Sequence, residues 1–262
     1  MEKKIENYYD NLIIINDDFY EKIIFSLNLI PVLNLYYVSF NGGKDCLAAY
    51  ILIKFKIFCI ECNLDYKKKE NFEKFSKEKF YTKKIILLYF VNDNHFEEEE
   101  NYVIKFIKKE KIFINYYYSS YADGLKFFLK KKNDKNDLIF MGTRIADNNN
   151  LDENRKKISI NLIENSTKPF PQFVRFYPVY NFNYSEIWKI ILISKYDYLN
   201  LYDKGFSSIG KKTNTNINKN LINKFYNNNE NKSDNNNINN KYNKYYYPAW
   251  FLIDEKSERE FR

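Results

Sequence analysis

A glycine pair followed at once by lysine and aspartate is the feature of this sequence with the clearest chemistry. It lies in the segment Ser39-Phe40-Asn41-Gly42-Gly43-Lys44-Asp45-Cys46, between a short apolar run and a segment with helical character. Glycines at a strand-to-helix turn let backbone N–H groups converge on an anion, and the helix N-terminus adds its positive end. Asp45 can hold a magnesium ion against phosphates. The spacing differs from that of a Walker A loop, so the segment predicts another kind of nucleotide-phosphate site.

Glycine and arginine are scarce in this chain, which makes their positions informative. Only six glycines occur, and lysine far outnumbers arginine among the 42 basic residues. Glycine permits positive φ and close backbone approach, and arginine contacts phosphate through a planar fork. Most of these residues fall in short segments, which are Gly42–Gly43, Met141-Gly142-Thr143-Arg144-Ile145-Ala146-Asp147, Phe170-Pro171-Gln172-Phe173-Val174-Arg175, Leu201–Gly210 and Glu258-Arg259-Glu260-Phe261-Arg262.

These segments, with Tyr246-Tyr247-Pro248-Ala249-Trp250, resemble in type and order the motifs of eukaryotic-type FAD synthases. The first segment is similar to the PP-loop of the ATP pyrophosphatase and PAPS reductase-like superfamily, whose members cleave ATP between the α- and β-phosphates. Three positions depart from the family pattern: Phe170 stands for a tryptophan, Thr167 for an acidic residue and Asn148 for a proline. These departures concern the flavin side of the expected site.

The resemblance implies a nucleotidyltransferase that moves AMP from ATP to FMN and yields FAD and pyrophosphate. The ATP-binding residues would be Ser39, Phe40, Asn41, Gly42, Gly43, Lys44, Asp45 and Cys46. The FMN-binding residues would be Gly142, Arg144, Asp147, Phe170 and Arg175. Asn41, Asp45 and Asp147 would surround Mg²⁺, and the catalytic residues would be Asp45, Asp147, Arg259 and Arg262. The attacking FMN phosphate is already anionic, so no general base is needed, which suits a chain with one histidine.

Apolar runs alternate with helical segments through the first half of the chain. The runs at 32–40, 84–91, 111–117 and 137–141 predict strands, and 44–54, 97–109 and 122–132 predict helices. This alternation favours a doubly wound, mostly parallel α/β sheet, of the adenine nucleotide alpha hydrolase-like type that the PP-loop implies. Ligands of such sheets bind beyond the carboxyl ends of the strands. The loops at Gly42 and Gly142 both follow strands and are therefore expected to face one crevice.

Five parts of the chain are expected. They are an N-terminal helical segment at 1–31, a PP-loop ATP-binding core at 32–147, a flavin-binding extension at 148–212, an Asn/Lys-rich disordered insertion at 213–244 and an active-site segment at 245–262. Within the extension, 148–168 is expected as loop, 169–180 as extended chain and 184–194 as a helix. The insertion is assigned because it holds few apolar residues.

Composition restricts the classes of ligand and the cellular setting that are expected for this chain. The net charge of +8 is carried by dispersed lysines, without an RNA-binding aromatic motif, so nucleotides are favoured over nucleic acid. Cys46, Cys59 and Cys62 form no disulfide framework, and a lone C-x-x-C with only His95 argues against zinc. A charged, polar start and the absence of a run of about 20 apolar residues predict a cytoplasmic protein without a membrane segment.

Other functions remain as alternatives. One is another adenylating PP-loop enzyme or a sulfonucleotide (PAPS) reductase, although a reductase needs a C-terminal cysteine and none follows Cys62. Another is a non-catalytic nucleotide- or nucleic-acid-binding protein, against which the intact loop at Gly42 argues. A nucleophilic role for Cys46 at a helix N-terminus is the weaker interpretation, because its neighbours are phosphate-binding in type.

Overall fold

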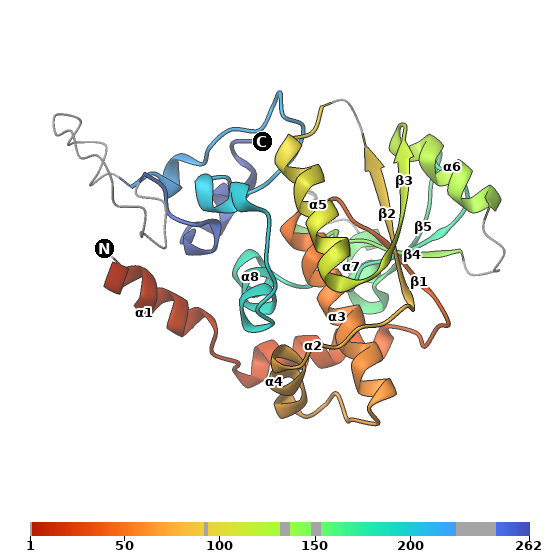
Figure 1. The fold of residues 1–262 in the computed structure, drawn as a ribbon, viewed down its shortest axis with the longest axis horizontal. Helices are drawn as coiled ribbons and strands as arrows, with labels where there is room; N and C mark the ends of the chain where they lie inside the picture. The colour runs from red at the N-terminus through yellow and green to blue at the C-terminus, as the bar shows by residue number, and fades with distance from the viewer. Residues whose placement is uncertain (1, 92–93, 132–136, 148–152, 224–244) are drawn as a thin grey trace.

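A six-stranded sheet forms the centre of the molecule in a computed structural model, which describes residues 2–91, 94–131, 137–147, 153–223 and 245–262. The strand order is β3-β2-β1-β4-β6-β5 (Figure 1). The strands are β1 Tyr36–Ser39, β2 Ile85–Val91, β3 Phe113–Tyr118, β4 Leu138–Phe140, β5 Ile163–Asn165 and β6 Val174–Phe176. All neighbouring pairs are parallel except β5 and β6, which are antiparallel. The predicted doubly wound, mostly parallel sheet is confirmed.

The sheet is covered on both faces, which explains its continuous apolar strands. Val38 and Leu87 pair in register and face the main core, with helices α3 Lys44–Glu61, α5 Glu97–Glu110 and α8 Tyr184–Ile193. Their chain neighbours face a smaller cluster under α6 Tyr121–Lys131. Figure 1 shows α3 and α5 on one side of the sheet and α6 on the other. Successive side chains of a strand point to opposite faces, so both layers are fixed by the same strands.

Helix α3 is the central helix and runs longer than the predicted 44–54. Its residues from Cys46 to Cys59 are buried on every side, which explains why no polar stripe is visible in the sequence. The helix begins directly after Gly43 and so carries its positive N-terminal end to the edge of the sheet. None of the helices in the described residues combines the length and apolar character needed to cross a bilayer.

The N-terminal segment, which was expected to be helical, is a pair of helices, α1 Glu2–Leu12 and α2 Asp17–Leu29. Asn16 caps α2 by accepting a hydrogen bond from the Phe19 amide at 3.1 Å. Helix α1 packs on the C-terminal segment, with the Tyr8 and Phe251 rings 4.8 Å apart. The two ends of the chain therefore stabilise each other.

Two parts of the chain differ from the expectation of loop or simple connection. The stretch 148–168 holds α7 Glu153–Asn161 and β5, and a further helix, α4 Lys69–Lys77, was not predicted. In 157–168 only Ile158 and Leu162 are buried. The sequence of this stretch is therefore mostly polar and shows no clear periodicity, and its helix and strand are stabilised by contacts with the sheet edge and with neighbouring elements. Short 3₁₀ helices connect the remaining parts: Ile145–Asp147, Asn200–Lys204, Lys219–Leu221, Ala249–Phe251 and Glu255–Arg259.

The assignment of 213–244 to a disordered insertion is wrong for 213–223, while 224–244 lies outside the described residues. Asn218 and Leu221 have no exposed surface. The Asn218 side-chain amide donates to Ser207 Oγ and to the Ser257 carbonyl, each at 2.9 Å. The segment is polar because its buried groups make hydrogen bonds instead of apolar contacts, which composition alone does not reveal.

Replacing Asn218 by alanine is expected to lower the free energy of unfolding by about 2 kcal/mol, because the buried partners of its amide lose their donor. The melting temperature should fall by roughly 5 °C for a chain of this size. Asn214→Ala is the matched control, since Asn214 is exposed and lies four residues away. Equal melting temperatures for both variants would show that Asn218 does not hold this segment.

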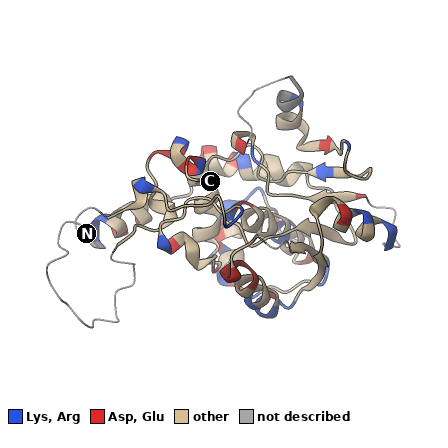
Figure 2. Ribbon diagram, turned by 90° about the horizontal axis from the view of Figure 1, so that it is seen from above, with Lys and Arg blue, Asp and Glu red and all other residues tan. Residues whose placement is uncertain are grey.

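Charged residues are spread over the whole molecule. Figure 2 shows Lys and Arg interspersed with Asp and Glu on many elements, without one element carrying the positive excess. The net charge of +8 therefore acts mainly as a general positive field, which favours the approach of anions.

Candidate active site

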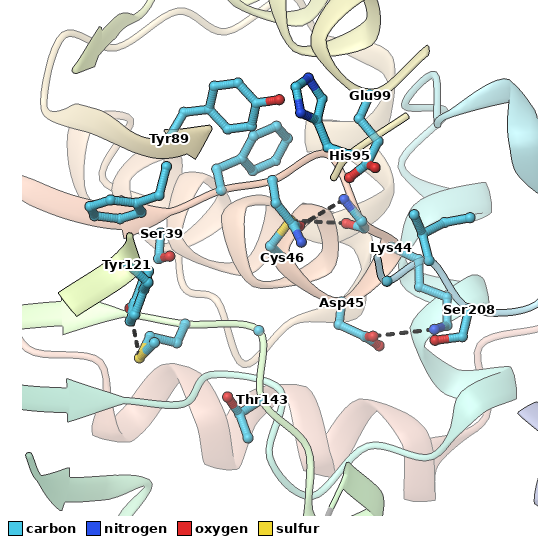
Figure 3. A pocket seen from close by; sticks show the side chains of 18 of the residues that line it. Ser39, Lys44, Asp45, Cys46, Tyr89, His95, Glu99, Tyr121, Thr143 and Ser208 are labelled. Carbon is cyan, nitrogen blue, oxygen red and sulfur yellow. Dashed lines mark hydrogen bonds and ion pairs between the residues drawn. The ribbon is translucent and has the colours of Figure 1, made fainter. Parts of the chain in front are cut away.

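A cavity of about 440 Å³ opens at the carboxyl ends of β1, β2 and β4. β1 lies between β2 and β4, so the chain turns to opposite sides of β1 at this point. Such a switch point is where doubly wound sheets form their ligand crevice. Both predicted loops contribute to the lining, which includes Asn41, Gly43, Asp45 and Gly142. Figure 3 shows Ser39, Lys44, Asp45 and Thr143 around the cavity.

The loop between β1 and α3 is built for close approach of an anion. Gly42 has φ +83°, a conformation that favours glycine. Asn41 Oδ1 accepts hydrogen bonds from the Gly43 amide and the Cys46 thiol, both at 3.0 Å, and so holds the turn closed. The Lys44 amide donates to Tyr202 Oη at 3.0 Å. The Asn41 side chain thus shapes the loop in this structure.

Gly142 brings the second loop against the first. A Cβ atom at this position would lie 2.4 Å from the Cys46 nitrogen and 2.5 Å from the Asp45 carbonyl carbon. Backbone atoms cannot move aside as a flexible side chain can, so any residue other than glycine would push the two loops apart. This contact explains how Asp147, far along the chain, comes to line the same cavity as Asp45.

Three cations and three carboxylates form a compact group beneath the cavity: Lys44, Arg144, Arg259, Asp45, Asp147 and Glu258. Arg144 is its centre. The guanidinium Nη2 lies 2.6 Å from both Glu258 oxygens, and Nε lies 2.8 Å from Asp45 Oδ1. Lys44 pairs with Glu258 and with Asp45, and Arg259 pairs with Asp147. Equal numbers of opposite charges make this burial tolerable.

The pKa values of the two aspartates move in opposite directions. Burial disfavours the charged form of Asp45, but Lys44, Arg144 and Arg259 together hold its pKa below the usual range. Burial and the nearby Asp45 carboxylate raise the pKa of Asp147. The Asp45 carboxylate therefore disfavours the ionised form of Asp147.

Arg259 and Arg262 reach the cavity from the C-terminal segment, and their catalytic role stays a prediction. Arg262 donates from Nη1 to Ser208 Oγ at 2.9 Å. Gly210 leaves room for the arginine, because a Cβ there would lie 2.5 Å from Arg262 Nε. Both arginines therefore belong to the lining of this cavity.

Comparison with known proteins agrees with this geometry. The sequence profile of the phosphoadenosine phosphosulfate reductase domain family matches residues 36–217. The chain belongs to this family.

Among individual proteins, the chain is 28% identical over 186 residues to the probable FAD synthase of Schizosaccharomyces pombe, a match covering 71% of this chain and 62% of that protein. It is 24% identical over 258 residues to the flavin adenine dinucleotide synthase of Saccharomyces cerevisiae, covering 86% of this chain and 80% of that one. The chain thus matches less than two thirds of the Schizosaccharomyces pombe protein. The resemblance predicted from the motifs is confirmed.

The fold is also that of a solved structure. Candida glabrata FMN adenylyltransferase, crystallised with FMN and the ATP analogue AMPCPP, superposes with a TM-score of 0.68 at 20% identity, covering 98% of this chain and 97% of that chain. At this identity the likeness shows a shared fold. The doubly wound sheet with its N-terminal helices and C-terminal segment is therefore a known arrangement.

Arg144 was expected to contact FMN, but the structure places it elsewhere. Its side chain has no exposed surface and does not line the cavity. The physical reason is the pair of carboxylates, Asp45 and Glu258, that surround the guanidinium and hold it inside. Arg144 thus positions the Asp45 carboxylate.

Phe170 and Arg175 lie together just beyond the cavity wall. The Arg175 guanidinium stands 5.0 Å from the Phe170 ring centre and 3.2 Å from Glu164. Phe170 packs edge-on against Tyr121, which does line the cavity. The flavin contacts of Phe170 and Arg175 stay a prediction, with Tyr121 as the residue that separates them from the described cavity.

The Cys46 thiol is not arranged as a nucleophile. Burial raises its pKa to about 12, and it donates to Asn41 Oδ1 and the Gly43 carbonyl. A protonated, doubly hydrogen-bonded thiol is inert at neutral pH. Cys59 is buried and Cys62 exposed, and in the described residues no three His, Cys, Asp or Glu side chains are arranged so that they could hold one metal ion together.

Two residues of the site were not predicted, although both stand inside quoted motifs. Glu258 binds Lys44 and Arg144 at once, and Tyr202 accepts from the Lys44 amide. Glu258 opens the E-R-x-x-R motif and Tyr202 belongs to the L-Y-x-x-G motif. Their positions within these motifs were the only sign in the sequence that they belong to the site. Their role is to position Lys44 and Arg144, and residue type alone does not reveal such a role.

Proposed function

We propose that the chain is an FAD synthase that transfers AMP from ATP to FMN. The observation that carries the proposal is the convergence of the Gly42–Gly43 loop, Asp45 and Asp147, and Arg259 and Arg262 on one cavity. The names of its relatives support it, since FAD synthases from two yeasts match most of this chain. The proposed substrates are ATP and FMN, and the products are FAD and pyrophosphate.

The reaction needs positioning and charge neutralisation more than acid–base chemistry. An oxygen of the FMN phosphate forms a bond to the α-phosphorus of ATP, and the bond from that phosphorus to the bridging oxygen of the β-phosphate breaks. The N-terminal end of α3 faces the phosphate oxygens, and the Gly43 amide binds one of them once it releases Asn41 Oδ1. Arg259 and Arg262 offset the charge that builds on the departing pyrophosphate.

Magnesium is part of the proposal, with Asp45 and Asp147 as its protein ligands. Their Oδ1 atoms are buried without a well-aligned hydrogen bond from the described residues, although cationic nitrogens lie near them. Carboxylate oxygens without fixed donors are suitable ligands for a hard cation. The ion would neutralise charge on the ATP phosphates when bound. Asn41 can offer its carbonyl oxygen only by giving up its loop hydrogen bonds.

A cytoplasmic setting belongs to the same proposal. Cys46, Cys59 and Cys62 are all unpaired. Cysteines are kept reduced in the cytosol, whereas secreted proteins tend to pair them.

A comparison of FMN with riboflavin tests the function. The purified chain with ATP and Mg²⁺ should convert FMN to FAD and release one pyrophosphate per FAD, because the phosphate of FMN is the nucleophile. Riboflavin lacks this phosphate and should give no FAD. Chromatographic measurement of flavins and a pyrophosphate assay check both results. Turnover of riboflavin, or no FAD from FMN, would overturn the proposal.

A parallel incubation tests the alternative that the chain is a sulfonucleotide reductase. A sulfonucleotide reductase forms sulfite through a reactive cysteine, and here Cys62 is the one exposed cysteine of the three. Incubation with a sulfonucleotide and a dithiol reductant should therefore give no sulfite. Sulfite formation that is lost in Cys62→Ser would favour the reductase.

A further inference from the structure

A second cavity, of about 590 Å³, lies between α5 and the chain that follows α8. Its described lining comes from one face of α5 and from 196–200, and it shares no residue with the cavity described above. Binding sites for small molecules have volumes in this range. The proposed reaction assigns nothing to this cavity.

A buried carboxylate forms one end of the second cavity. Glu110 is only 6% exposed, and its Oε2 accepts from Tyr50 Oη at 2.7 Å and pairs with Lys54. Its other oxygen, Oε1, accepts no hydrogen bond from the described residues, yet Glu110 lines the cavity. Oε1 therefore stays free to accept a hydrogen bond from an N–H group of a ligand.

Aromatic rings form the walls. Tyr102, Phe106 and Tyr196 line the cavity, and the Phe106 and Tyr196 ring centres are 6.3 Å apart. Such rings present flat apolar faces, which stack favourably on a planar heterocycle. The walls and the carboxylate together suit a flat ring that carries amino or ring N–H groups.

Lysines stand at the rim. Lys105 is exposed and has no acidic partner among the described residues, whereas Lys109 is paired with Asp197 at 2.5 Å. Lys105 and Glu110 are separated along α5 by about 7.5 Å, from the helical rise of 1.5 Å per residue. Both residues line the cavity, so one ligand can contact both.

The second cavity also touches the PP-loop segment. A Cβ at Gly42 would lie 3.0 Å from the Tyr102 ring, and Phe106 stacks on Phe40 with ring centres 4.8 Å apart. Phe40 lines the first cavity and Phe106 the second, so this stacked pair of rings separates the two cavities. A ligand that orders Tyr102 and Phe106 would therefore also order the loop that holds phosphate.

We propose that this second cavity binds a purine nucleoside monophosphate, with the base packed against the exposed side of these rings, a base N–H donating to Glu110, and the phosphate at Lys105. The site is separate from the proposed AMP-transfer site and would couple to it through Tyr102 and Phe106. By reciprocity, a ligand in one cavity changes the affinity of the other by an equal factor.

Titration calorimetry with AMP and GMP tests this site, with the first cavity saturated by a non-hydrolysable ATP analogue and Mg²⁺. One equivalent of AMP or GMP should bind to the parent protein. Lys105→Glu should weaken this binding at least tenfold, because an attraction for phosphate becomes a repulsion. The matched control is Lys108→Glu, an equally exposed lysine of α5 outside the lining, which should bind like the parent.

Ribose 5-phosphate, which lacks the base, should show no saturable binding. The proposal is overturned if neither AMP nor GMP binds, if Lys105→Glu and Lys108→Glu bind equally, or if ribose 5-phosphate binds as tightly as the nucleotides. The test does not depend on FAD formation. If the ATP analogue fails to bind, the proposed function is weakened, but the contrast between the two lysine variants still reports on the second cavity.

Discussion

Replacing Asp45 by asparagine is expected to lower the rate of FAD formation by about a hundredfold or more. Asp45 lines the first cavity and carries the negative charge that faces Lys44 and Arg144. Asparagine keeps the shape of the side chain but removes the charge that a metal ion requires. Losses of on the order of a hundredfold are typical when one group that stabilises charge at a reacting centre is removed.

The rate should be measured as FAD formed from FMN and ATP over a series of Mg²⁺ concentrations. The variant should stay folded, because Arg144 keeps both oxygens of Glu258. Asp203→Asn is the matched control: Asp203 is a partly buried aspartate, bonded to Tyr198 Oη at 2.9 Å, and it lines neither cavity. A near-parent rate for Asp45→Asn at every Mg²⁺ concentration would remove Asp45 from the catalytic group.

Removal of residues 259–262 is expected to lower turnover by roughly ten- to a thousandfold, below the range for a full arginine finger. The truncation deletes Arg259 and Arg262 from the cavity but leaves Glu258, which holds Lys44 and Arg144 in place. The loss should therefore appear in turnover, and the chain should stay folded, with a melting temperature lowered by the loss of the ion pair between Arg259 and Asp147.

Arg259→Lys should recover part of the loss when it is made in the full-length chain, since lysine keeps the charge but lacks the planar fork. Lys256→Ala serves as the control, because Lys256 is an exposed cation of the same 3₁₀ helix and does not line the cavity. Steady-state rates of FAD formation should be measured for the truncated enzyme, Arg259→Lys and Lys256→Ala. Parent-like turnover of the truncated enzyme would show that the C-terminal arginines do not act in the reaction.

Local sequence determined the sheet and the segments that meet at its edge. Continuous apolar runs such as Ile85–Val91 can be stable only as buried strands, and their alternation with helices restricts the connections to a doubly wound sheet. Gly42 with its φ of +83° marks a turn that few other residues adopt. These features depend on neighbours in the chain, so they can be read without the fold.

Polar segments gave less reliable predictions. The stretch 213–223 was expected to be disordered, yet Asn218 is fully buried and bonded to Ser207 and Ser257. Helix α7 was expected to be loop. In both cases the residues that stabilise the segment lie far away along the chain. Composition indicates only how much apolar area a segment can bury, so it does not reveal these contacts.

The roles of the charged residues were decided by tertiary structure. Arginine in the M-G-T-R motif is equally suited to a phosphate or to a buried carboxylate, and only the approach of Glu258, 114 positions later, places Arg144 inside. The same approach makes Glu258 a part of the site. Residue type and spacing established which groups this chain can bring to a nucleotide. Long-range packing decided which of them face the ligand and which hold their neighbours, because the burial of a charge depends on partners that the local sequence does not contain.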